Sequence, residues 1–177
     1  MIKREKGMTL IEVMVSLIIL VIGLVGIFNL HIVAKRGSFE SFQQTQASYY
    51  ANDIINRMRL NPSQLANYAG TYPGSPSGTA PTACTGTAAD CSFAEMKDWD
   101  LYEWQSLFSG AAEVAGGNNV GGLDTPTACI TVAANTVTVV MAWKGIRETK
   151  ITEADVDTSC AATTVNRRVF SIQTVII

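Results

Sequence analysis

The stretch KGMTLIEVMVSLIILVIGLVGIF, residues 6–28, decides the architecture of this 177-residue chain. From Met8 to Phe28 the only charged residue is Glu12. These 21 residues would extend about 31 Å as a helix, which is long enough to cross the hydrocarbon core of a membrane. An ionised carboxylate in that environment costs roughly 2.5 to 3.5 kcal/mol, so Glu12 is expected to have a partner.

The residues on either side of the apolar run favour one orientation. Lys3, Arg4 and Lys6 precede Gly7 and form a basic flank that would stay in the cytoplasm, although Lys35 and Arg36 weaken this bias. A secretory signal would have a shorter apolar region followed by a small-residue cleavage site, which does not follow this run. The sequence therefore predicts a leader over 1–7 and a transmembrane helix over 8–28.

Residues 29–61 predict an amphipathic continuation of the same helix. Apolar side chains recur mostly three or four residues apart, at Val33, Phe39, Phe42, Tyr49, Tyr50, Ile54, Met58 and Leu60. The helix is predicted to end at Asn61, because a proline follows and disfavours helix at the preceding residue. Gly23, Gly26 and Gly37 lie inside it and indicate either close helix packing or local loosening.

The rest of the chain, 62–177, is predicted to form one globular domain. Residues 62–92 are rich in turn residues and predict a surface connection. A capping box at Ser92 and Glu95 begins a short helix over 93–109, whose aromatic residues are expected in the core. Beyond a glycine-rich loop the apolar period changes to two, which predicts an antiparallel sheet of three to four strands over 127–177. The predicted fold class is α+β, with the second half of the long helix packed on this sheet.

All four cysteines lie in this domain, at Cys84, Cys91, Cys129 and Cys160. Their spacing lacks the paired knuckles of a zinc site, and an even number beyond a membrane-competent segment favours disulfides in an oxidising compartment. Four cysteines allow three connectivities. We favour Cys84 with Cys91, which closes a small loop, and Cys129 with Cys160, which ties the last strand to the sheet. Four free thiols remain the alternative.

No catalytic, metal-binding or cofactor-binding site is predicted. Net charge is −2, which argues against a nucleic-acid partner. The Gly116-Gly117 and Gly121-Gly122 pairs lack the rest of a phosphate-binding motif. Glu153, Asp155 and Asp157 lack the turn glycine and final glutamate of a calcium loop. The remaining candidates are interpreted as structural or surface residues, namely His31 and the helix carboxylates Glu95, Asp98 and Glu103. We therefore expect a protein that is not an enzyme.

The segment KGMTLIEVMVSLIILVIG resembles the class III signal of type IV prepilins. The resemblance rests on Gly7 before the junction, on Glu12 at the fifth position after it, and on an apolar run that begins at once. Met8 departs from the phenylalanine usual at that position. The resemblance implies a type IV pilin-like fold, cleavage between Gly7 and Met8 by prepilin peptidase, N-methylation of Met8, and pairing of Glu12 with the new amine of another subunit.

Later segments are similar to PilV-type minor pilins, the type IV pilus modification proteins. They are ASYYANDIINRMRLNP at the helix end, the W-x-x-L of Trp104 to Leu107, and the strands TVTVVMAWKG and RRVFSIQTVII. This similarity implies a minor pilin in a tip or assembly-priming complex that supports adhesion and twitching motility. Its partners would be other minor pilins, the major pilin, a tip adhesin and the inner membrane, with the C-terminal domain in the periplasm.

Two alternatives remain open at this point. A minor pseudopilin of a type II secretion system would have the same leader and helix. A single-pass membrane enzyme or sensor would keep residues 1–7 uncleaved. Asp53, Arg57 and Arg59 near the helix end are candidates for contacts with neighbouring subunits, or are ordinary helix-surface charges.

Overall fold

The computed structural model describes residues 7, 9–86, 90–147, 160 and 166–177. It divides into two compact units, Met1–Phe39 and Glu40–Ile177. The predicted α+β class with a long apolar N-terminal helix, a second short helix and a small antiparallel sheet is confirmed. The acidic loop holding Glu153, Asp155 and Asp157 lies outside the described residues.

The first unit consists of the N-terminal part of α1 (Leu10–Leu60), which continues through Gly23, Gly26 and Gly37. Its large apolar side chains between Leu10 and Val33 are 45% to 79% exposed. By length and composition this part of α1 could cross a membrane, and its most apolar stretch has none of its residues buried. Such a large exposed apolar surface is unusual for a soluble monomer and calls for a lipid or protein environment around it.

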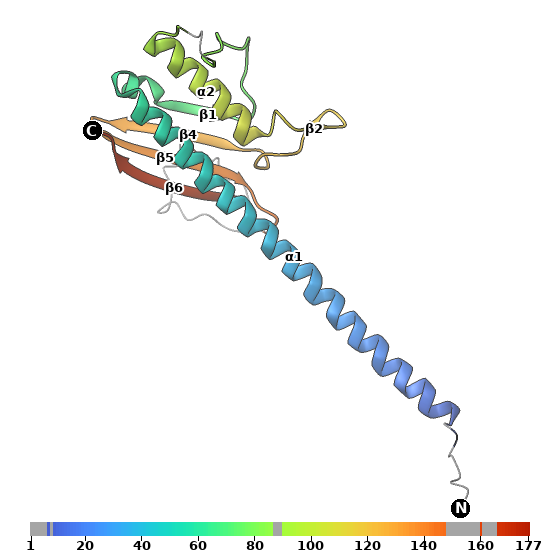
Figure 1. The fold of residues 1–177 in the computed structure, drawn as a ribbon. Helices are drawn as coiled ribbons and strands as arrows, with labels where there is room; N and C mark the ends of the chain where they lie inside the picture. Colours follow the sequence, from blue (N-terminus) through green and yellow to red (C-terminus); the bar gives the residue numbers. More distant parts are fainter. Residues whose placement is uncertain (1–6, 8, 87–89, 148–159, 161–165) are drawn as a thin grey trace, which may run out of the picture. The chain divides into compact units, whose positions relative to one another are not determined.

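The second unit begins at Glu40 within α1 and contains all the other elements. In chain order these are the 3-10 helix η1 (Pro62–Tyr68), β1 (Gly70–Pro73), α2 (Phe93–Ser109), β2 (Val114–Ala115), β3 (Asn118–Asn119), β4 (Thr127–Ala133), β5 (Thr136–Lys144) and β6 (Arg167–Val175). Strands β1-β4-β5-β6 form one antiparallel sheet in that order, and β2 and β3 form a separate two-stranded ribbon (Figure 1).

The two faces of the sheet have different partners, as the alternation of side chains along a strand requires. On one face Ile130, Val139 and Met141 pack in the main core with residues of α1 and α2. Within this core, Trp104 of α2 donates a hydrogen bond from Nε1 to the Tyr50 carbonyl of α1 at 2.8 Å. Val140 belongs to a smaller cluster that also contains Cys129 and Cys160. Helices therefore cover one face of the sheet, and the smaller cluster with the two cysteines lies on the other face.

The turn-rich segment predicted as a surface connection over 62–92 contains two regular elements, η1 and β1. Tyr68 at the end of η1 is fully buried in the main core, and β1 pairs with β4 from Gly70↔Ile130 to Pro73↔Thr127. The interpretation of this whole segment as surface was therefore wrong. The turn residues around β1 gave no sign of a strand, because β1 is stabilised by its pairing with β4, almost sixty positions away in the sequence.

The burial of the second half of α1 also differs from the prediction. Tyr50, Ile54 and Met58 are buried as expected, together with Ala47 and Ala51. Five of the apolar residues assigned to the same stripe are exposed instead: Val33, Phe39, Phe42, Tyr49 and Leu60. Ala47 and Ala51 are both 0% exposed, so small side chains occupy part of the buried face of the helix.

The short helix occupies the predicted range, and its capping box is present. The Ser92 side chain accepts a hydrogen bond from the Glu95 amide, and the Glu95 carboxylate accepts one from the Ser92 amide. Trp104 and Phe108 are buried as predicted for the aromatic face, whereas Phe93 at the first turn is 66% exposed. The prediction that all its aromatic residues lie in the core was therefore wrong for Phe93.

The glycine pair at 121–122 has a packing role. Gly110 ends α2 in the left-handed conformation, at φ 68°. A Cβ added to Gly122 would lie 2.4 Å from the Gly110 nitrogen and 2.4 Å from the Phe108 carbonyl oxygen. The backbone of the following loop can approach the end of α2 this closely only because both positions lack a side chain.

A charged cluster joins α1 to the end of the sheet. Glu40 accepts hydrogen bonds from Arg147 Nε at 3.0 Å and from Arg168 Nη2 at 3.2 Å. The hydrogen bonds from Arg147, assisted by Arg168, lower the pKa of Glu40 from 4.5 to about 2, against the opposing effect of burial. The Glu40 side chain is only 12% exposed, while that of Arg147 is 63% exposed, so solvent weakens part of this cluster.

Glu40→Gln is expected to reduce the free energy of unfolding of the second unit by on the order of 2 kcal/mol at pH 7. A carboxylate whose folded pKa lies below its unfolded value stabilises the fold above the unfolded value, and this contribution is lost as pH falls toward about 2. Guanidinium unfolding of the detergent-solubilised chain, followed by tryptophan fluorescence, tests this because Trp99, Trp104 and Trp143 all lie in the second unit.

Glu113→Gln is the matched control, since Glu113 is exposed. The difference between Glu40→Gln and the unmodified chain should shrink between pH 4.5 and pH 2.5, while the control changes little at any pH. A difference that persists unchanged at pH 2.5 would contradict the assignment.

Candidate functional site

Glu12 lies in the first turn of α1 and is exposed. The Glu12 amide donates to the Thr9 carbonyl at 3.1 Å, so the carboxylate projects from the beginning of the helix. A negative side chain there interacts favourably with the helix dipole. In the part of the chain that the structure describes, Glu12 forms no ion pair. The large apolar residues that flank it, Leu10, Ile11 and Val13, are exposed as well.

Arg57 forms a second charged site, within the second unit. Its Nε donates to Asp53 at 2.9 Å, and its Nη1 donates to Asp100 at 3.3 Å and to Glu103 at 2.6 Å. Burial opposes the charge of the guanidinium, but Glu103 and Asp53 raise the pKa of Arg57 above its ordinary value. The site therefore holds three carboxylates around one permanent cation.

Two polar side chains extend this site into the core. The Tyr68 hydroxyl donates to the second Asp100 oxygen at 2.7 Å. Burial, and then the hydrogen bond to Asp100, raise the pKa of Tyr68 above its ordinary value. The Asn61 amide donates to the Phe93 carbonyl at 2.8 Å and to the Tyr68 hydroxyl at 3.4 Å. These contacts connect α1, η1 and α2 through buried polar groups that have partners.

The comparisons with known proteins agree with the architecture. Residues 2–28 match the prokaryotic N-terminal methylation motif, and residues 30–102 match the family described as Type IV pilin Tt1218. The two matches show a type IV pilin. No curated protein and no solved structure matches the chain significantly.

In this pilin the methylation motif covers the predicted leader, the junction and the apolar helix. Gly7 is exposed just before the helix begins, whereas Met8 lies outside the described residues. The match implies processing by prepilin peptidase and assembly with other pilins. The apolar part of α1 and the motif together fit a membrane-anchored pilin.

The four cysteines of the pilin form two disulfides, Cys84–Cys91 and Cys129–Cys160. This is the pairing favoured among the three connectivities. Cys129 lies in β4 and Cys160 is buried beside it, so the second disulfide closes a loop with a sequence separation of 31 residues. The first joins residues seven positions apart and ends one residue before the cap of α2.

The charges predicted at the end of α1 separate into two kinds. Asp53 and Arg57 take part in the intramolecular site described above, whereas Arg59 contacts Asn56 and Thr174 at the surface. Sequence reasoning missed the link from Arg57 to Asp100, which is 43 residues away. A carboxylate at position 100, on the same helical face as Trp104, was the available signal, because a charge on a buried face needs a partner.

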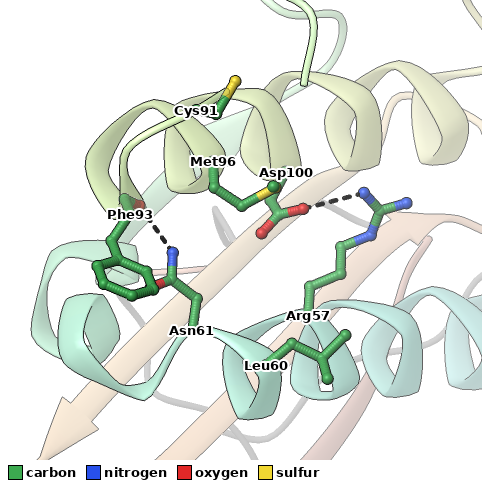
Figure 2. A pocket seen from close by; sticks show the side chains of 7 residues that line it. All are labelled: Arg57, Leu60, Asn61, Cys91, Phe93, Met96 and Asp100. Atoms are coloured by element: carbon green, nitrogen blue, oxygen red, sulfur yellow. Dashed lines mark hydrogen bonds and ion pairs between the residues drawn. The ribbon is translucent and has the colours of Figure 1, made fainter. Parts of the chain in front are cut away.

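A pocket of about 230 Å³ lies beside this site in the pilin (Figure 2). The lining residues come from the end of α1, from the segment after it and from the first turns of α2: Arg57, Leu60, Asn61, Cys91, Phe93, Met96 and Asp100. No group of three or more histidine, cysteine, aspartate or glutamate residues in the described ranges could hold a metal ion. His31, on the apolar part of α1, is exposed.

Proposed function

We propose that this chain is a minor pilin of the type IV pilus, of the PilV type. It is cleaved after Gly7, methylated on the amine of Met8, and incorporated into a complex that primes assembly or forms the pilus tip. Its work is structural rather than catalytic. Through this complex it supports pilus biogenesis, and hence adhesion and twitching motility.

One observation carries this proposal: a helix with an exposed apolar surface from Leu10 to Val33 begins with an exposed carboxylate and matches the methylation motif. Before assembly this helix spans the inner membrane once, and the domain from residue 62 onward lies in the periplasm. The two disulfides suit an oxidising compartment.

Assembly moves the apolar helix from lipid into a bundle of similar helices. Because both environments are apolar, little hydrophobic free energy changes, and packing and polar contacts select the partners. Cleavage after Gly7 creates a cationic amine on Met8. In the bundle, Glu12 pairs with the amine of a neighbouring subunit, and this pair sets the axial register between the two helices.

The mature N-terminus tests the proposal. Protein recovered from sheared pili is expected to begin with N-methylated Met8 when its N-terminal peptide is measured by mass spectrometry. It should be present at a small fraction of the amount of the major pilin. Protein that retains residues 1–7, or that is absent from the pilus fraction, would refute the proposal.

A further inference from the structure

The edge of the sheet at β6 is long and uncharged over most of its length. β6 ends the strand order β1-β4-β5-β6, and among the described residues it pairs only with β5 (Figure 1). The stretch VFSIQTVII, residues 169–177, contains no charged residue, proline or glycine. The opposite edge strand, β1, has four residues and ends in Pro73. Proteins usually protect a sheet edge by a short strand, proline or charge, and β6 has none of these over this stretch.

Hydrogen bonds beyond the two ends of β6 show which of its backbone groups face outward. Gly145 donates to the Asn166 carbonyl at 2.7 Å, and Ile176 donates to the Asn135 carbonyl at 2.9 Å. Hydrogen-bonded and non-hydrogen-bonded positions alternate in an antiparallel pair, so both bonds assign the even-numbered residues of β6 to the ladder with β5. The N–H and C=O groups directed away from β5 therefore include those of three odd-numbered residues, Ser171, Gln173 and Val175.

A groove of about 480 Å³ lies between α1 and β6. Four polar residues of α1 and one aromatic residue of β6 line it: Ser41, Gln44, Thr45, Ser48 and Phe170. Phe170 and Ile172 pack against the main core but are only partly buried. Side chains alternate between the two faces of a strand, so a strand added beside β6 would direct every second side chain toward this face of the sheet. The uncharged lining favours neutral side chains there.

Arg59 of α1 adds a positive charge near the end of β6. Its Nη2 donates to Thr174 Oγ1 at 3.3 Å, and its Nη1 donates to Asn56 Oδ1 at 3.2 Å. The residue is exposed, and no carboxylate of the described ranges forms an ion pair with it. A carboxylate that accepts hydrogen bonds from a guanidinium forms a stronger contact than a neutral acceptor. The charge at this end of the edge therefore favours an acidic partner.

We propose that the outer edge of β6 receives an extended segment of a different pilin subunit. The segment forms a fifth strand of the sheet and carries an acidic side chain opposite Arg59. Outward N–H and C=O groups at strand spacing bind a chain that is itself extended and has unpaired backbone groups. The proposal rests on the proposed function, which supplies the neighbouring subunit, and adds a backbone contact made by the second unit.

The two edge strands of this chain do not match this requirement. Neither β1 nor β6 contains an aspartate or glutamate, so neither strand of a second copy has a carboxylate for Arg59. An antiparallel β6 would also bring Arg167 and Arg168 toward Arg59, and like charges placed opposite each other are destabilising. Charge complementarity therefore favours a different subunit over a second copy.

Photo-crosslinking of the full chain in cells that assemble pili tests this contact. Ser171→p-benzoylphenylalanine places the probe at an exposed position within β6. We expect an adduct with a different pilin, in which the attached peptide, mapped by mass spectrometry, contains an aspartate or glutamate. Gln173→Pro removes one outward N–H and should reduce the adduct about tenfold. Gln173→Ala keeps that N–H and should leave the yield unchanged.

A folding control separates loss of the contact from loss of the fold. Thr174→Pro removes an N–H of the ladder with β5 and should lower the midpoint of guanidinium unfolding, whereas Gln173→Pro should have the same midpoint as Gln173→Ala. Val175→Pro, compared with Val175→Ala, tests the next outward N–H independently. If both outward proline variants lower the midpoint as Thr174→Pro does, these groups do not face outward and the proposal is overturned.

Two further comparisons test the partner. Arg59→Gln should reduce the adduct about fivefold, while Arg59→Lys, which keeps the charge, should retain most of it. A probe at Ile18, which is 56% exposed on the apolar helix, reports whether the chain assembles with pilins at all. Adducts from Ile18 but none from Ser171 overturn the edge proposal and leave the proposed function intact, whereas adducts from neither position overturn both.

The identity of the Ser171 adduct is also decisive. An adduct with lipid or with a second copy of this chain would overturn the proposal. So would an adduct with a pilin whose yield is the same in the folded proline and alanine variants.

Discussion

Glu12→Ala is expected to leave cleavage after Gly7 largely intact and to abolish incorporation into pili. In the proposed mechanism, cleavage acts on the junction before the helix, whereas incorporation depends on pairing of the Glu12 carboxylate with the amine of a neighbouring subunit. Removing one partner of a buried ion pair costs about 3 to 5 kcal/mol, which corresponds to a loss of about 100-fold or more. Immunoblots of the membrane and sheared-pilus fractions measure both steps.

Ser16→Ala is the matched control for this experiment. Ser16 lies one turn further along the same helix, and its hydroxyl contacts only the Val13 carbonyl, at 2.9 Å, among the hydrogen bonds of the described residues. This variant should be cleaved and incorporated normally. Normal incorporation of Glu12→Ala would refute the pairing role, and a defect in cleavage would assign Glu12 to recognition by the peptidase instead.

Arg57→Met is expected to have the largest effect on the stability of the second unit. The change leaves Asp53, Asp100 and Glu103 without the guanidinium that they share, and Asp100 is 7% exposed. Loss of one partner from a buried ionic cluster costs roughly 3 kcal/mol. Guanidinium unfolding followed by tryptophan fluorescence should show this loss at pH 7.

Arg59→Met provides the comparison two residues away on the same helix. Arg59 is exposed, and its contacts are hydrogen bonds of 3.2 Å to Asn56 and 3.3 Å to Thr174. Its replacement should change the free energy of unfolding by no more than about 0.5 kcal/mol. Similar losses in the two variants would show that the shared guanidinium is not what stabilises the join between α1 and α2.

The elements with strong local signals were predictable from the sequence. The capping box fixes where α2 begins, and the alternation of apolar residues identifies β4, β5 and β6. In contrast, β1 has four residues in a segment full of turn residues, and only its pairing with β4 makes it a strand. Local propensity carries no information about such pairing, because the partner strand is distant in the sequence.

Helix periodicity gave the wrong buried face for part of α1 for a related reason. Phe42 and Tyr49 are apolar enough to suggest a core position, but they are exposed, whereas Ala47 and Ala51 are fully buried. When a helix has two apolar faces, hydrophobicity alone does not show which face is buried in the domain core and which face stays exposed. The Arg57 site was missed for the same reason. Asp100 and Glu103 lie on α2, and the sequence does not show that α2 packs beside Arg57 of α1.

The disulfide between Cys129 and Cys160 has a consequence for proteolysis. A single cut anywhere between Gly145 and Cys160 would separate β6 from β5 in the covalent backbone. The fragment that begins before Cys160 would still be attached to β4 through the sulfur bridge, and β6 would still be paired along β5 from Thr136↔Val175 to Lys144↔Arg167. A nicked subunit would thus keep its last strand in place, and its two pieces would separate on a denaturing gel only after reduction.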